Sequence, residues 1–80
     1  MKEFKKGYVY HKDGIDYLIL NKTKCFITYQ KIYHLGRFNE KFSEPKKRKY
    51  ITHVDHETFF TGTTEVSSLF VNGQAVILER

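Results

Sequence analysis

Several short stretches of the chain alternate between hydrophobic and polar residues, which is the pattern of a β-strand with one buried face. Residues 8–12 alternate in this way and are followed by Asp13-Gly14, a dipeptide that accepts the positive φ angles of a tight hairpin turn. Residues 15–21 form the partner strand, and we expect them to be central in a sheet because both of their faces are apolar. The pattern therefore predicts a β-hairpin near the start of the chain.

Further strands are predicted beyond this hairpin. Residues 24–33 form the longest one, whose two faces carry Phe26, Thr28, Gln30 and Ile32 on one side and Cys25, Ile27, Tyr29, Lys31 and Tyr33 on the other. Residues 49–54 alternate again and predict a fourth strand. A short strand at residues 59–61 and a final strand at residues 75–78 complete the set.

A long loop is predicted between the third and fourth strands. Residues 34–48 keep neither the strand period nor the helix period, and four turn-forming residues interrupt them: Gly36, Asn39, Ser43 and Pro45. Long loops in small domains tend to be functional or mobile.

One short helix is predicted at residues 64–71. Thr63 can cap its first backbone donors, and Asn72-Gly73 can end it because glycine accepts a left-handed closing conformation. A strand is the alternative for this segment, since it contains threonine, valine and phenylalanine, which are weak helix formers.

The composition favours a mainly β fold. Val, Ile, Thr, Tyr and Phe make up 31 of the 80 residues, and these branched and aromatic side chains suit a pleated surface. The length allows one domain, residues 1–80. We therefore predict a small antiparallel β-barrel, SH3-like or OB-like, with one short helix. The alternative is an α+β fold in which an open antiparallel sheet carries the helix on one face.

The sequence excludes several classes of protein. No apolar run approaches the ~20 residues of a membrane-spanning helix, and no charged start is followed by the apolar stretch of a secretion signal. A lone cysteine, Cys25, forms no internal disulfide, which suits a reducing compartment, so we expect a cytoplasmic protein.

Positive charge is concentrated in the first two thirds of the chain. Residues 1–54 contain 13 Lys and Arg against 5 acidic residues, a net charge of +8, whereas residues 55–80 contain 1 against 4, a net charge of −3. The densest cluster comprises Arg37, Lys41, Lys46, Lys47, Arg48 and Lys49. Such a cluster can bind phosphates by releasing their counterions, so it indicates nucleic acid as a partner. A solvated loop is the alternative interpretation.

Tyrosines on the predicted strands add a second feature of nucleic-acid binding. Rings beside cations on a sheet can stack on unpaired bases, and Tyr29, Tyr33 and Tyr50 are the rings we expect in this role. Packing in the core is the alternative role for these rings. In these features the chain resembles small β-barrel nucleic-acid binders, and in size and charge it looks like accessory proteins of phages and other mobile elements. The resemblance assigns no residue roles.

A protein partner is the alternative function. Phe38 and Phe42 either anchor the long loop to the body of the protein or form an apolar tip that contacts an acidic protein. An interaction module or inhibitor would use this tip or a sheet edge, and exposed edges also allow a homodimer.

No catalytic residue, metal site or cofactor is predicted. His53 and His56 are three residues apart, but no Cys-x-x-Cys pair accompanies them, and Cys25 has no activating base at a recognisable spacing. The five glycines are scattered singly, so they form no phosphate-binding loop. We therefore expect a binding protein and not an enzyme.

Overall fold

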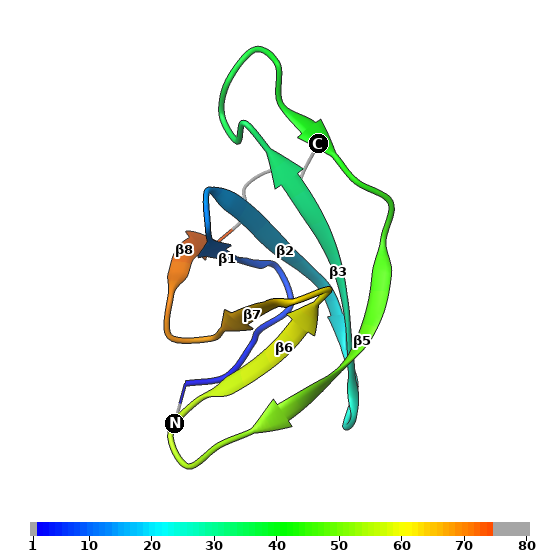
Figure 1. The fold of residues 1–80 in the computed structure, drawn as a ribbon, viewed down its shortest axis with the longest axis vertical. Coiled ribbons are helices and arrows are strands. Elements are labelled where there is room, and N and C mark those ends of the chain that lie inside the picture. Colours follow the sequence, from blue (N-terminus) through cyan, green and yellow to red (C-terminus); the bar gives the residue numbers. More distant parts are fainter. Residues whose placement is uncertain (1, 75–80) are drawn as a thin grey trace.

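The computed structural model describes residues 2–74, and these residues form an antiparallel sheet without a helix (Figure 1). The strands are β1 (Tyr8–Lys12), β2 (Ile15–Lys22), β3 (Phe26–Tyr33), β4 (Lys41–Phe42), β5 (Lys46–Thr52), β6 (Glu57–Thr61), β7 (Thr64–Ser67) and β8 (Val71–Gln74).

The sheet curls on itself into a half-barrel. Its strand order is β7-β6-β5-β3-β2-β1-β8, and β4 pairs with the end of β3. Figure 1 shows the β6–β7 hairpin extending toward β2 and β3, and the ring of Phe59 on β6 contacts the rings of Tyr17 on β2 and Tyr29 on β3. The prediction of a mainly β, barrel-like fold is confirmed.

Of the two tight hairpin turns among residues 2–74, the sequence predicted the first and not the second. Asp13 and Gly14 both have positive φ angles, 51° and 78°, as the predicted turn between β1 and β2 requires. The turn between β6 and β7 is Gly62-Thr63, and Gly62 has a φ of 65°. Glycine in the first central position is required by the type II′ turn, the second of the two common two-residue hairpin turns.

The predicted helix at residues 64–71 is wrong. The Gly62 turn sends the chain back along β6, so these residues form β7, a turn and the start of β8. The side chain of Val66 is fully buried on the inner face of β7, which stabilises the strand despite the cap at Thr63. The predicted strand at residues 75–78 lies outside the described residues.

The long loop is shorter than predicted. Strand β5 begins at Lys46, so the basic run lies on a strand, and β4 interrupts the remaining segment. Phe42 on β4 pairs with Ile32, which ties the middle of the predicted loop to the sheet. The third strand also begins later than predicted, and Cys25 is exposed in the turn before it.

The buried side chains form two clusters on opposite faces of the sheet. The inner cluster is rich in aromatic rings: Phe4, Tyr10, Tyr17, Ile19, Ile27, Tyr29, Phe59 and Val66. The outer cluster contains Val9, Leu18 and Ile32, with Leu20, Leu35 and Phe42 packed against it. Both faces of β2 are therefore buried, as the sequence predicted.

A buried carboxylate connects separate parts of the chain at one end of the inner cluster. Glu57 has only 3% of its side chain exposed, and its Oε1 accepts hydrogen bonds from the Lys22 Nζ at 2.8 Å and the Phe4 backbone N–H at 2.9 Å. The backbone N–H of Glu57 donates to the Ser68 hydroxyl, which in turn donates to the Lys2 carbonyl oxygen. The N-terminal segment, β2, β6 and the turn after β7 are thus linked.

Replacing Glu57 with glutamine removes the negative charge beside Lys22 and keeps the shape of the side chain. We expect Glu57→Gln to lower the free energy of unfolding by about 3 kcal/mol, because it leaves the largely buried Lys22 ammonium group with only the exposed Glu3 carboxylate, 3.8 Å away. Urea denaturation followed by circular dichroism measures this change. The control Glu65→Gln removes an exposed carboxylate and should stay within about 0.5 kcal/mol of the parent protein. Equal losses in both variants would contradict the role assigned to Glu57.

Candidate nucleic-acid interface

Strand β5 displays the basic run in an extended conformation. Its Lys46, Lys47, Arg48 and Lys49 are all exposed. These four residues pair with β3, whereas only Tyr50, Ile51 and Thr52 pair with β6. Because successive side chains of a strand point to opposite faces, the basic run is divided between the two sides of the sheet.

Lys46 and Arg48 lie on the concave side. Their direct partners on β3 are Tyr29 and Ile27, which belong to the inner cluster, and directly paired residues share a face. The same face of β3 continues through Lys31 to Tyr33, whose partner on β4 is Lys41. We call these five residues the concave basic surface: Lys31, Tyr33, Lys41, Lys46 and Arg48.

Lys47 and Lys49 lie on the convex side with Phe26. Lys49 is the direct partner of Phe26, and the ammonium groups of Lys47 and Lys49 are 4.7 and 5.9 Å from the centre of its ring. These contacts are cation–π interactions, in which the ring face attracts a positive charge. Phe26 is half-buried, so the two lysines cover part of its surface.

The three predicted stacking tyrosines have different environments. Tyr29 has none of its surface exposed, and its ring centre lies 4.8 Å from that of Phe59, so it is a core residue and cannot stack on a base. Tyr50 is half-buried, and its hydroxyl lies 2.9 Å from the carbonyl oxygens of Thr23 and Lys24. Its ring is also covered by the Lys22 ammonium group, 5.0 Å from the ring centre. Tyr33 is partly exposed and remains available.

The segment between β3 and β4 carries the remaining predicted residues. Arg37 and Phe38 are exposed at its tip, and Phe38 has its whole side chain in solvent. Phe42 instead packs against the outer cluster. One phenylalanine therefore anchors the segment and the other forms an apolar tip.

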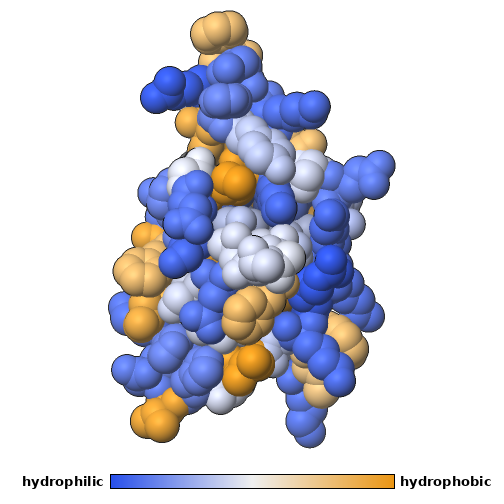
Figure 2. Space-filling model, viewed as in Figure 1, coloured by the Kyte–Doolittle hydropathy of each residue, from blue (hydrophilic) through white to orange (hydrophobic). Residues whose placement is uncertain are grey.

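Within the described residues, the cations of the concave basic surface form no ion pair with an acidic side chain. Among residues 2–74 the ion pairs join His11 to Asp16, Lys22 to Glu3 and Glu57, and His56 to Asp55. None of them includes a cation of this surface. Figure 2 shows hydrophilic atoms along the side of the molecule formed by β5. The surface can therefore attract and bind a polyanion.

Residues 55–74, the described part of the acidic end of the chain, show no comparable site. The hydrogen bond from His56 lowers the pKa of Asp55, and the rings of His53 and His56 stack with their centres 4.5 Å apart. Within the described part of the chain, no three His, Cys, Asp or Glu side chains gather where they could hold a metal ion.

Two residues of this region were not among the predicted site residues. Lys31 alternates with Tyr29 and Tyr33, so the strand period already placed it on their face. Phe26 lies opposite Lys49 because of the register between β3 and β5. No local sequence pattern predicts that register.

The chain matches no protein-family model, no curated protein and no solved structure. In residues 2–74 there is also no helix with the length and hydropathy needed to cross a membrane.

The buried hydroxyl of Tyr29 has no hydrogen-bond partner among the described residues. We expect Tyr29→Phe to raise the free energy of unfolding by about 1 kcal/mol, because an unsatisfied buried hydroxyl costs stability. The matched variant Tyr10→Phe should lower it by about 1–2 kcal/mol, since the Tyr10 hydroxyl bonds the Lys5 N–H and the Glu3 carbonyl oxygen. Urea denaturation compares the two, and a similar loss in both would contradict the assignment.

Proposed function

We propose that the concave basic surface binds single-stranded nucleic acid. The observation that carries the proposal is the presence of four cations without ion-pair partners among residues 2–74, on the same face as the partly exposed ring of Tyr33. The cations contact phosphates and release their counterions, which provides affinity without dependence on base sequence. Tyr33 stacks on a base, and only an unpaired base offers its face to a protein ring.

Lys47, Lys49 and Arg37 have a secondary role in this proposal. Lys47 and Lys49 face the convex side with Phe26, and Arg37 lies in the segment beyond β3. Their charges attract a polyanion at a distance, which accelerates encounter more than it strengthens the bound complex.

An acidic protein segment is the second candidate partner, and a different observation favours it. Lys46–Lys49 pair with β3 on one side, while the ladder with β6 covers only Tyr50 to Thr52. Within the described residues, the other edge of this basic stretch has no strand beside it. An extended acidic peptide could add there through backbone hydrogen bonds, with the exposed Phe38 as a further contact.

Two double variants of the same strand test the proposal. Lys46→Gln with Arg48→Gln removes two charges from the concave side, and Lys47→Gln with Lys49→Gln removes two from the convex side. We expect the concave variant to bind a fluorescent single-stranded oligonucleotide at least about tenfold more weakly, and the convex variant at most about threefold, because only the concave cations contact phosphates. Fluorescence anisotropy at fixed salt measures both affinities.

Salt dependence provides a second measurement on the same variants. The log–log slope of affinity against salt should become shallower by about 1.4 in the concave variant, which is about 0.7 for each lost phosphate contact on a single strand. Equal slopes and equal affinities in the two double variants would contradict a face-specific interface. If polyglutamate of equal charge displaces the oligonucleotide at the same concentration, the acidic-peptide alternative is favoured.

Tyr33 is tested separately from the charges. We expect Tyr33→Ala to weaken oligonucleotide binding by about tenfold without changing the salt slope, because a lost base stack corresponds to about 1–3 kcal/mol. Tyr33→Phe keeps the ring and should retain the parent affinity. An unchanged affinity in Tyr33→Ala would show that the ring makes no stacking contact.

A further inference from the structure

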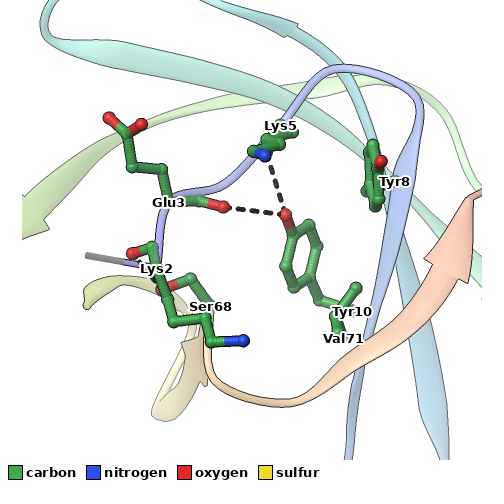
Figure 3. A pocket seen from close by; sticks show the side chains of 7 residues that line it. All are labelled: Lys2, Glu3, Lys5, Tyr8, Tyr10, Ser68 and Val71. Carbon is green, nitrogen blue, oxygen red and sulfur yellow. Dashed lines mark hydrogen bonds between the residues drawn. The ribbon is translucent and has the colours of Figure 1, made fainter. Parts of the chain in front are cut away.

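A hollow of about 170 Å³ lies between the N-terminal segment, β1 and the turn that joins β7 to β8 (Figure 3). Its lining consists of Lys2, Glu3, Lys5, Tyr8, Tyr10, Ser68 and Val71. Tyr10 and Ser68 are buried and form the floor, whereas Lys2, Lys5 and Val71 are exposed at the rim. An engineered cavity of about 150 Å³ in another protein holds benzene, so this hollow can hold one planar ring.

The polar groups of the floor are already satisfied within the protein. The Tyr10 hydroxyl donates to the Glu3 carbonyl oxygen at 3.0 Å and accepts from the Lys5 backbone N–H at 2.9 Å. Burial raises the pKa of Tyr10, so this phenol stays neutral. The Ser68 hydroxyl donates to the Lys2 carbonyl oxygen and accepts from the Glu57 N–H. The floor therefore offers a ligand a shape and not a hydrogen-bonding pattern.

The rim of the hollow is positively charged. In the described part of the chain, neither Lys2 nor Lys5 takes part in an ion pair. The Glu3 carboxylate lies 3.8 Å from the Lys22 ammonium group, and Figure 3 shows it pointing away from Tyr10. In the same view the Lys2 ammonium group is directed toward Tyr10. Among the described residues, a ligand in the hollow therefore meets two cations, while the Glu3 carboxylate of the lining points away from it.

The aromatic ring of Tyr8 lines the hollow beside these cations. The ring of Tyr8 is only partly buried, and the Lys5 ammonium group lies 5.9 Å from its centre. The exposed side chain of Val71 contributes an apolar surface to the same hollow. A ligand that uses both features has a planar apolar body and an attached anion.

We infer that the hollow binds one nucleotide, with its base against Tyr8 and Val71 and its phosphate between Lys2 and Lys5. The inference rests on the proposed function for the source of the nucleotide, because an unpaired nucleotide of a bound strand and a free nucleoside monophosphate have the same chemistry. The hollow shares no residue with the concave basic surface, so the two sites can be tested apart. Since the floor offers no free hydrogen-bonding groups, AMP and UMP should bind with affinities within about threefold of each other.

Titration of the isotope-labelled full chain by nuclear magnetic resonance tests the inference. UMP should shift the backbone signals of Lys5, Tyr8 and Val71 saturably, and uridine and inorganic phosphate should each bind at least about fivefold more weakly, because each lacks one of the two contacts. Tyr8→Ala and Lys5→Gln should each weaken UMP binding at least about fivefold. The control Lys6→Gln, a neighbouring exposed charge outside the hollow, should bind UMP as the parent does.

Two results would overturn the inference. One is equal affinity for inorganic phosphate and UMP, which would make the hollow a general anion site. The other is the absence of saturable shifts at Lys5, Tyr8 and Val71. The double variant Lys46→Gln with Arg48→Gln separates this inference from the proposed function, since it should still bind UMP in the hollow.

An oligonucleotide identifies the source of the ligand. If 5′-phosphorylated oligouridylate shifts the same signals at lower concentration than UMP, the bound nucleotide belongs to a strand. If only UMP shifts them, the ligand is a free nucleotide. Both results support the nucleotide chemistry and determine where it comes from.

Discussion

The carboxylate of Glu57 is buried at the point where the N-terminal segment, β2 and β6 meet, and it must be paired there because an isolated charge in this position would be strongly unfavourable. Lys22 and the Phe4 N–H provide that pairing. The backbone N–H of Glu57 donates to the Ser68 hydroxyl, which connects Glu57 to the turn after β7. These contacts fix β6 across the inner face of β2 and β3. The position of β6 then decides which rings of that face are covered, so the exposure of the tyrosines on the concave side depends on the contacts of Glu57.

The consequence is visible along β3. Tyr29 and Tyr33 have the same orientation, but Phe59 covers Tyr29 and leaves Tyr33 beyond the reach of β6. The cations of β5 that share this face are Lys46 and Arg48, while the alternating pair Lys47 and Lys49 faces Phe26. Because the run of positive charge lies on a strand, its side chains alternate between two surfaces that have different neighbours. In the part of the chain that the structure describes, the concave one combines charge outside any ion pair with a partly exposed tyrosine ring, and the convex one does not.

Local features of the fold could be predicted from the sequence, and features set by distant contacts could not. The Asp13-Gly14 turn and the two apolar faces of β2 depend on neighbouring residues, and both predictions agree with the structure. Residues 46–48, the start of β5, fall in the predicted loop because both of their faces are exposed, so they have no hydrophobic period. The helix prediction gave weight to the cap at Thr63 and overlooked the hairpin signal of Gly62. The burial of Tyr29 depends on Phe59 of β6, which lies 30 residues further along the chain.

The edge of β5 has one more consequence, which concerns the behaviour of the protein at high concentration. A strand edge without a neighbour can recruit the same strand of a second molecule and begin aggregation, and lysine on such an edge is a common natural safeguard. Here four successive basic side chains occupy the edge, so two molecules approaching through it repel each other. The protection is electrostatic and therefore weakens as salt screens these charges.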